Sequence, residues 1–376
     1  MKKILLFAAA MAIMGCGTAQ VDSEESLTRY VDPNIGTDDH GHVFMGANVP
    51  FGFVQLGPSQ ICQGWDWCSG YHAQDSTIYG FAHQHLSGTG IGDLGDVLLM
   101  PVVRGGERME THDRTTAIAR PGYYSVTLDH SRIRVELTAT ARAGMHRYTY
   151  PAANDSIHML LDLRYGLCWD AMTGSRITVE NDSVVTGYRL STGWAKDQRT
   201  YFVAVFDRTI AGIDGDSAVS TLHFAPSDDP SLMVRVALSP VSVANAKENL
   251  AAEMPDWNFE AVAEAADRAW NDALRKIRIE TADEDAKRVF YTAMYHSMTA
   301  PSVFCDVNGD YRGADGVTRR GDFTNYTTLS LWDTYRAAHP LSTLIHSERQ
   351  ADFAHTFINI FKQQGKLPVW HLMGNE

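Results

Sequence analysis

The spacing of apolar residues divides this chain into two parts. Between residues 30 and 242, apolar and polar positions alternate in short runs separated by turn residues. Ile133, Val135, Leu137 and Ala139 alternate with polar side chains, which is the period of a half-buried strand. Several strands without intervening helices indicate an antiparallel β-sandwich. The other strand-like runs are 157–163, 175–190, 200–206 and 232–239.

Beyond residue 242 the apolar spacing becomes that of helices. Val262, Ala266, Trp270, Leu274 and Ile277 recur at steps of three or four residues and form one helical face. We therefore expect a β-sandwich domain over residues 27–245, a linker helix over 256–278 and a helical domain over 279–376.

A second helix is expected to end before Pro301. The residues on its predicted apolar face are Val289, Phe290, Ala293 and Met294.

A third helix is expected between residues 347 and 365. Ser347 with Gln350 is a capping-box pattern at its start, and Gly365 is a typical residue at its end. Its apolar stripe consists of Phe353, Phe357 and Phe361.

Composition and charge indicate a globular, exported protein. The chain has 376 residues, of which 44% are apolar, so it can bury sizeable cores. Its formal net charge of −13 disfavours nucleic acid as a partner, because such binding needs clustered Lys and Arg. Residues 1–20 begin with MKKILLFAAAMAIMGC, in which two lysines precede an apolar run too short to span a bilayer. This pattern predicts a secretory signal.

The signal ends in I-M-G-C, which resembles the lipobox of bacterial lipoproteins. In such proteins the cysteine, here Cys16, becomes the acylated first residue. The protein would then be anchored to the outer membrane of a Gram-negative bacterium, facing the periplasm or the cell surface. The alternative is an ordinary signal cleaved near Ala19.

Four further cysteines are Cys62, Cys68, Cys168 and Cys305. In an oxidising compartment they can form disulfides, but their wide spacing defines no framework. No two of them stand two residues apart, so they make no zinc pattern.

Residues 30–101 combine Trp, His, Asp and Gly in predicted loops. This mixture suits a sugar, whose apolar ring face stacks on indole while its hydroxyls need fixed donors and acceptors. The alternative is that the glycines form turns and the aromatic side chains pack the sandwich.

Two H-x-H pairs, His40 with His42 and His83 with His85, raise the possibility of zinc. Alternate residues of a strand share a face, so each pair can chelate an ion. However, no acidic third ligand stands at a diagnostic spacing. Loop packing or sugar contact is therefore the preferred interpretation.

Trp332, Asp333 and Arg336 lie at the start of a predicted helix. Asp333 and Arg336 are three residues apart and are expected to pair across one turn. An Asp beside a Trp in a cleft can hold two sugar hydroxyls, and Arg336 would keep this carboxylate ionised. The alternative is an ordinary ion pair at a helix start.

The last run, LPVWHLMGNE, places Glu376 after a segment with tryptophan and glycine. Inverting glycosidases use one carboxylic acid to protonate the leaving oxygen and a second carboxylate to activate water. Glu376 is a candidate for the acid, and its partner is expected beyond the end of this chain.

Taken together, these segments resemble family 92 of the glycoside hydrolases, bacterial exo-acting α-mannosidases. The matching runs, in order, are YVDPNIGT, VPFGFVQLGP, WDWCSGYH, GFAHQHLSGTGIGDLGDVLLMP, SLWDTYRAAHPL and LPVWHLMGNE. The resemblance implies an N-terminal β-sandwich packed on an (α/α)6 barrel, which would be incomplete here. It also implies inverting hydrolysis of terminal α-linked mannose in N-glycans or mannan, with a Ca²⁺ ion that binds the mannose and distorts its ring.

The resemblance further implies roles for single residues. Glu376 would be the general acid. The implied sugar contacts are Trp65, Asp66, Cys68, Trp332, Asp333, Arg336 and His371. The family commonly has Gly where this chain has Trp67. The catalytic base and most calcium ligands belong to later helices in the family, so the fragment alone is expected to be inactive.

Two other functions fit parts of the same pattern. A noncatalytic glycan-binding lipoprotein would present the aromatic side chains to sugar without hydrolysis. An inverting sugar phosphorylase shares the sandwich-plus-barrel architecture but needs a basic phosphate pocket, which the acidic balance of this chain disfavours.

Overall fold

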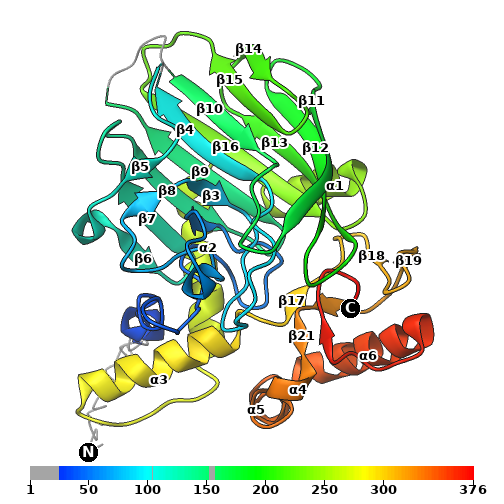
Figure 1. Cartoon of the computed structure of the whole chain (residues 1–376). Coiled ribbons are helices and arrows are strands. Elements are labelled where there is room, and N and C mark those ends of the chain that lie inside the picture. Colours follow the sequence, from blue (N-terminus) through cyan, green and yellow to red (C-terminus); the bar gives the residue numbers. More distant parts are fainter. Residues whose placement is uncertain (1–24, 104, 152–156) are drawn as a thin grey trace, which may run out of the picture.

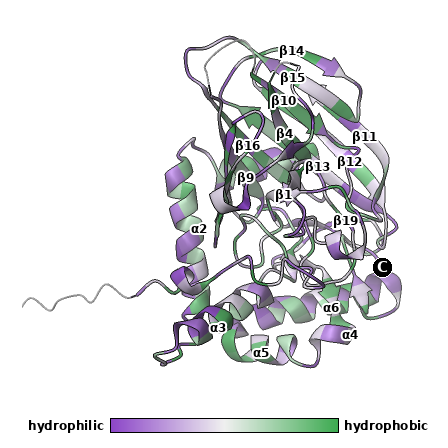
Figure 2. Ribbon diagram, turned by 60° about the vertical axis from the view of Figure 1, so that its left-hand side comes forward, coloured by the Kyte–Doolittle hydropathy of each residue, from purple (hydrophilic) through white to green (hydrophobic). Residues whose placement is uncertain are grey.

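The computed structural model describes residues 25–103, 105–151 and 157–376. The predicted signal sequence and Cys16 lie outside these residues. Two large antiparallel sheets make up the first part, and helices α3 to α6 lie together below them (Figure 1; Figure 2). The prediction of a β domain followed by a helical region is therefore confirmed. In the described part of the chain, no helix has the length and apolarity needed to cross a membrane.

Both large sheets are formed by strands from distant parts of the first domain. The six-stranded sheet has the order β1 (Gly57–Ser59), β3 (Gly80–Ala82), β4 (Leu98–Val103), β10 (Ile157–Asp162), β15 (Val219–Phe224) and β14 (Ile210–Gly215). The eight-stranded sheet has the order β11 (Ala171–Val179), β12 (Val184–Thr192), β13 (Gln198–Phe206), β16 (Ser231–Ser239), β9 (Ala143–Thr149), β8 (Arg134–Ala139), β7 (Tyr123–Thr127) and β6 (Ile118–Arg120). All four of the longer strand-like runs in the sequence form strands of these sheets.

The largest core contains residues of both sheets, and β8 shows how the sequence forms it. Val135 and Leu137 of this strand are fully buried in that core, as their alternation predicts. Glu136 points to the opposite face but is only 7% exposed. It accepts hydrogen bonds from Tyr123 and Arg147, and Arg147 also pairs with Glu260 of the helix that covers this face. The face expected to be half exposed is therefore covered as well.

Short strand pairs and helices form the rest of the chain. The pairs are β2 (Thr77–Ile78) with β5 (Glu110–Thr111), β17 (Ser302–Val303) with β20 (Tyr326–Thr327), β18 (Asp310–Arg312) with β19 (Thr318–Arg320), and β21 (Leu329–Ser330) with β22 (Trp370–His371). The helices are α1 (Val243–Glu253), α2 (Phe259–Leu274), α3 (Glu284–Ser297), α4 (Leu331–Thr334), α5 (Ala338–Ile345) and α6 (Gln350–Gln364). Single 3-10 turns are η1 (Leu27–Tyr30), η2 (Trp65–Trp67), η3 (Arg114–Thr116) and η4 (Ser347–Arg349).

Helix α1 precedes the helix that the sequence pattern predicted first. Ser242 caps it by accepting a hydrogen bond from the Asn245 backbone at 3.1 Å. Ala246 and Leu250 pack on β13 and β16, while most other positions are polar, so the apolar period is too weak to predict the helix. The proposed domain limits at 27–245, 256–278 and 279–376 stay predictions.

Helix α2 agrees with its predicted face. Ala266, Trp270 and Leu274 are buried. The Trp270 indole donates a hydrogen bond to the backbone carbonyl of Asn48 at 2.7 Å, which joins this helix to the β domain. Ile277 lies beyond the helix end and is partly buried.

The predicted apolar face of helix α3 is right in part: Met294 is buried and Phe290 is partly buried. Val289 is 61% exposed, and Ala293 is exposed too. The buried face instead carries Tyr291 and Tyr295, whose rings pack 5.7 Å from Tyr30 and 4.4 Å from Trp270 respectively. The Tyr295 hydroxyl donates to Asn48 Oδ1 at 3.0 Å. Because a hydrogen-bonded Tyr can be fully buried, Tyr291 and Tyr295 join Met294 in the core, while Val289 and Ala293 are left outside it.

The capping box predicted at Ser347 is wrong. Residues Ser347–Arg349 form η4, and α6 begins three residues later, at Gln350. The Gln350 amide therefore bonds to Ser342 Oγ and to the His346 carbonyl instead of the helix start. Of the predicted stripe, Phe353 is buried and Phe361 is 51% exposed.

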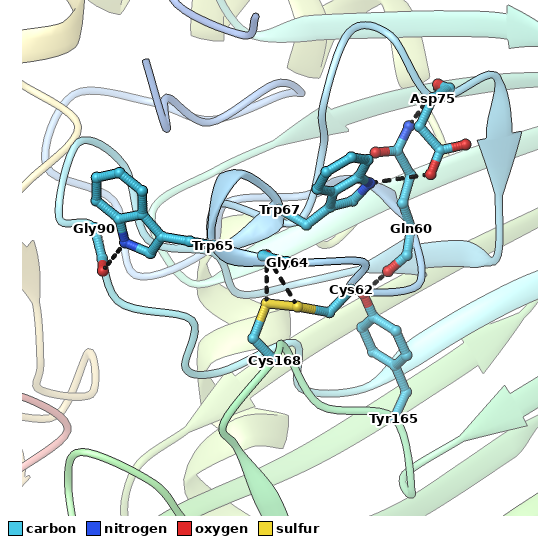
Figure 3. Close-up of a disulfide and its surroundings, with 9 residues drawn as sticks. All are labelled: Gln60, Cys62, Gly64, Trp65, Trp67, Asp75, Gly90, Tyr165 and Cys168. Carbon is cyan, nitrogen blue, oxygen red and sulfur yellow. Dashed lines mark hydrogen bonds between the residues drawn. A yellow bond between two sulfur atoms is a disulfide. The ribbon is translucent and has the colours of Figure 1, made fainter. Parts of the chain in front are cut away.

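One disulfide joins Cys62 to Cys168, while Cys68 and Cys305 are free and buried. It closes a loop of 106 residues and links the loop after β1 to the loop after β10 (Figure 3). Gly92 packs against it: a Cβ at this position would lie 2.4 Å from Cys168 Cβ. The close packing of a third loop, between β3 and β4, on this disulfide therefore depends on a glycine here.

We expect replacement of both Cys62 and Cys168 by Ser to destabilise the protein by about 2–4 kcal/mol, because the cross-link removes conformational freedom from the unfolded chain. Urea unfolding of the two proteins measures the difference. A reductant should lower the stability of the wild type and leave that of the double variant unchanged; equal sensitivity would contradict this assignment.

Candidate active site

A short β-ladder brings together two segments that are distant in sequence. Ser330 of β21 pairs with Trp370 of β22, and Leu329 pairs with His371. Next to this ladder, the Leu331 backbone N–H donates to the Val369 carbonyl at 2.9 Å. Since Trp332 and Asp333 directly follow β21, they lie beside the segment that ends in Glu376.

The tip of the β12–β13 hairpin holds that segment from the side of the β domain. The Trp194 indole donates to the Trp370 carbonyl at 3.0 Å. The Lys196 backbone donates to Asn375 Oδ1 at 2.8 Å, and the Asn375 amide donates to the Asp197 carbonyl at 2.7 Å. Asn375, the residue before Glu376, is thus held by two hydrogen bonds to the β domain.

Glu376 itself is largely covered, with 12% of its side chain exposed. Its Oε2 accepts a hydrogen bond from the Val369 backbone at 3.1 Å, and its Oε1 lies 3.7 Å from Lys366 Nζ. His371 is buried close by, and neither ring nitrogen has a partner among the described residues. Burial lowers the pKa of His371 to about 4, so its imidazole is neutral at physiological pH.

A cavity of about 160 Å³ lies between the β domain and the helices. Ser87, Gly88 and Thr89 line it from the first domain, and Ser330 and Asp333 line it from the second. Ligand pockets usually measure about 300–1,000 Å³, so these residues would enclose a sugar ring only in part. Asp333 is the one predicted site residue that lines this cavity, and convergence of all of them on one cleft stays a prediction.

Trp65 contacts Gly90, which directly follows the cavity-lining residues Gly88 and Thr89. It is 51% exposed, and its indole donates to the Gly90 carbonyl at 2.9 Å. Figure 3 shows Trp65 and Trp67 pointing away from each other, with the Trp67 indole bonded to Asp75 Oδ2 at 3.0 Å. Trp65 is therefore half exposed beside the loop that lines the cavity, whereas Trp67 is tied into the β domain.

The other predicted contacts differ in exposure. Trp332 is 56% exposed. Cys68 is 1% exposed, and burial raises the pKa of its thiol to about 11, so the group is neutral and covered. Asp66 is engaged by His40 and His42. The sugar-contacting roles of these residues stay predictions.

The predicted ion pair between Asp333 and Arg336 does not form. Asp333 Oδ2 accepts from Ser330 Oγ at 2.6 Å, and the Arg336 guanidinium lies 5.5 Å from the centre of the Tyr335 ring. The reason is that α4 ends at Thr334, so the two residues do not share a helical turn.

The histidines of the second H-x-H pair pack the interior. The Nδ1 atoms of His83 and His85 bond to the carbonyls of Val97 and Gln55. Their Nε2 atoms lie 2.9 Å from His146 Nε2 and Ser59 Oγ. Burial lowers the pKa of both to about 4. Both rings are satisfied by protein groups, which agrees with the packing interpretation.

A buried ionic network joins loops of the β domain. Arg189 of β12 is fully buried, with its guanidinium 3.1 Å from Asp96 Oδ1 and bonded to Asp170 Oδ1. Its Nε donates to the Leu163 carbonyl at 2.9 Å, and Asp170 Oδ2 accepts from Ser191 Oγ. One arginine thus joins the loop before β4 to the loop that carries Cys168.

Asp93 lies in the loop before β4 and links this loop to the tip of the β12–β13 hairpin. Its Oδ2 accepts from the Trp194 backbone at 2.8 Å and from the Gln198 amide at 3.0 Å. Burial raises its pKa to about 7. The folded protein therefore holds this proton more tightly than the unfolded chain does.

We expect Asp93 to make stability fall as the pH rises from about 4 to about 7. The stability that Asp93 contributes is fully present below the pKa of the unfolded state. It is lost as the pH rises through the higher pKa of the folded state. Unfolding by urea across this range should show a flatter pH dependence for Asp93→Asn than for the wild type. Identical slopes would show that Asp93 does not carry the effect.

Two family models match nearly the whole described chain. The glycosyl hydrolase family 92 N-terminal domain matches residues 30–239, and the family 92 catalytic domain matches residues 245–376. The chain belongs to glycosyl hydrolase family 92. The ladder between β21 and β22 thus lies in the catalytic domain of this family 92 protein, and the hairpin that supports it lies in the N-terminal domain.

Solved structures of family 92 proteins share this fold. An α-mannosidase from Bacteroides thetaiotaomicron in complex with mannoimidazole is 32% identical, with a TM-score of 0.88 over 94% of this chain and 51% of its own. An inverting mannosidase from Bacteroides thetaiotaomicron VPI-5482 is 24% identical, with a TM-score of 0.82 over 93% of this chain and 50% of its own.

A secreted, uncharacterised glycosidase from Arthroderma benhamiae is 26% identical over 83% of this chain and 46% of that protein. The family 92 chain described here therefore spans about half the length of the relatives it matches.

Several residues of the site have no signal in the sequence. The hydrogen bonds of Trp194, Lys196 and Asn375 join residues more than 170 positions apart. Gln84, in the GFAHQHL segment, likewise contacts the segment of residues 367–376. Its side-chain amide nitrogen lies 4.0 Å from the sulfur of Met373. Such contacts depend on how the two domains pack, which local periodicity does not encode.

Proposed function

We propose that this chain carries part of the active site of an exo-acting, inverting α-mannosidase that removes terminal α-linked mannose from glycans. Family membership supports a glycosidase, and the family 92 neighbour in complex with mannoimidazole supports mannose as the substrate class. The observation that carries the proposal is the β21–β22 ladder, which places Trp332 and Asp333 beside the segment of Glu376.

In this proposal Glu376 is the general acid. It would protonate the departing glycosidic oxygen, while a second carboxylate about 6.5–9.5 Å away activates water on the opposite face of the sugar. We infer that the second carboxylate comes from a part of the complete protein that this chain does not span. The chain alone is expected to bind sugar without hydrolysing it.

Trp65 and Trp332 are proposed as stacking surfaces for the sugar, since both indoles are more than half exposed. Asp333, Arg336 and His371 would contact hydroxyl groups from the helical side. Asp66 and Cys68 belong to the same η2 turn as Trp65, and Cys68 would support the turn from below rather than touch the ligand directly. The two sheets would form the family's sandwich, and α3 to α6 the beginning of an (α/α)6 barrel.

Ca²⁺ is proposed as a cofactor of the complete enzyme. Among the described residues, the one group of three possible ligands close enough to share an ion consists of two histidines and one aspartate. Ca²⁺ takes six to eight oxygen ligands, so this group does not fit it.

The location of the protein is also a proposal. Export is supported by the secreted relative and by the disulfide, which persists in oxidising compartments. Lipid attachment at Cys16, and with it an outer-membrane location, rests on the lipobox-like sequence.

The complete protein tests this function directly. We expect it to release mannose from α-mannosides, and NMR should show β-mannose as the first product, because one displacement inverts the anomeric centre. Chelation should abolish the activity, and Ca²⁺ should restore it. Glycan binding without release of mannose would instead support the noncatalytic alternative, and α-mannose as first product would exclude inversion.

A further inference from the structure

A loop and a turn of the β domain bring two histidines and one carboxylate together at the surface. His40 and His42 lie in the loop between η1 and β1, and Asp66 lies in η2. His40 Nδ1 is 2.6 Å and His42 Nε2 is 3.1 Å from the same Asp66 Oδ1. All three atoms lie within 4.8 Å of one another. Asp66 is thus the acidic third ligand that the sequence spacing did not reveal.

The charges around this cluster favour a cation. Among the ion pairs of the described residues, Asp66 pairs with these two histidines and with no lysine or arginine. Asp39 adds a second negative charge next to His40.

The cluster combines one fixed ligand with one adaptable ligand. The His42 side chain is 6% exposed, and its ring contacts Trp65 edge-on at 4.2 Å between centres. Its backbone carbonyl accepts from the Gly88 N–H at 2.7 Å. The His40 side chain is 73% exposed, so it can adjust its position without disturbing the interior.

We propose that His40 Nδ1, His42 Nε2 and the Asp66 carboxylate bind a divalent transition-metal ion of the zinc class, with solvent in the remaining position. Two imidazoles and one carboxylate suit Zn²⁺, whereas Ca²⁺ and Mg²⁺ prefer oxygen ligands alone. Tetrahedral bonds of about 2.0–2.2 Å place neighbouring ligand atoms roughly 3.3 Å apart. The two hydrogen-bonded separations would widen by less than about 1 Å to reach this value, mainly through the exposed His40.

The bound ion would join the 36–44 loop to η2. Trp65 connects the metal ligands to the next loop. Its ring contacts both histidines, and its indole N–H donates a hydrogen bond to the Gly90 carbonyl. Gly88 and Thr89, just before Gly90, line the cavity between the domains. The ion would therefore fix the orientation of an exposed indole that is bonded to the residue following this part of the cavity wall.

Titration of the full chain, prepared without a polyhistidine tag and stripped with a chelator, tests the site. We expect calorimetry to show about one equivalent of Zn²⁺ bound, and Co²⁺ to give the intense visible absorption of a tetrahedral complex. Zn²⁺ should also raise the unfolding midpoint, because it binds the folded state. His40→Ala and Asp66→Asn should each weaken binding at least about 10-fold.

His130→Ala is the matched control, since His130 is an exposed histidine in the turn between β7 and β8. This variant should bind Zn²⁺ as the wild type does. His40 is mostly exposed and Asn has the shape of Asp, so metal-free unfolding midpoints should match the wild type and show that these variants fold. Absence of stoichiometric Zn²⁺ binding by the wild type, unchanged affinity in both ligand variants, or displacement of Zn²⁺ by excess Ca²⁺ would each overturn the proposal.

Discussion

In the complete protein, Glu376→Gln is expected to slow the hydrolysis of mannosides with poor leaving groups by about 10²–10⁴-fold. Aryl mannosides with good leaving groups should lose far less. Protonation matters only when the departing oxygen is basic, and glutamine cannot supply a proton. Values of kcat/KM for a disaccharide and for an activated aryl mannoside measure the contrast.

Glu348→Gln provides the control for this experiment, because Glu348 lies in η4 with 53% of its side chain exposed. It should leave both rates unchanged. An equal loss on both substrate classes in Glu376→Gln would assign Glu376 to sugar binding instead of proton transfer.

Arg189→Met is expected to cause the largest loss of stability, about 3–5 kcal/mol, because it leaves Asp96 and Asp170 buried without their cation. The loss should shrink at low pH, where the two carboxyls can take up protons and become neutral. Guanidinium unfolding followed by tryptophan fluorescence at two pH values measures both effects.

Two further variants separate the buried charge from other causes. Arg164→Met removes an exposed partner of Asp216, a pair with both side chains 61% exposed, and should cost no more than about 1 kcal/mol. Combining Arg189→Met with Asp96→Asn and Asp170→Asn should recover much of the lost stability, since no unpaired charge remains. If the triple variant stays as unstable as Arg189→Met, packing around the arginine dominates.

Local patterns predicted the elements whose periodicity is complete within one strand or helix. Val135 and Leu137 of β8, and Trp270 of α2, are buried as their spacing indicates. The same reasoning was right for Met294 of α3 but wrong for Val289, because a hydropathy pattern ranks Val289 above Tyr295, whereas the hydroxyl of the tyrosine has a buried partner.

The candidate site depends on contacts that no local pattern contains. The family motifs implied shared roles for Trp332, Asp333 and Glu376, and the β21–β22 ladder brings the two segments that carry them side by side. By contrast, the disulfide partner of Cys62 and the association of Asp66 with His40 and His42 follow from the folding of separate loops. Spacing alone could not select these pairs from the alternatives.

The hydrogen bonds between the β12–β13 hairpin and Asn375 also have a consequence for protein engineering. The family models divide the chain between residues 239 and 245, which invites domain exchange between family members at this point. Such a chimera would separate Lys196 and Asp197 from the Asn375 to which they are hydrogen-bonded. The hairpin tip (residues 193–197) and the segment of residues 367–376 should therefore be transferred together, although they lie on opposite sides of the domain boundary.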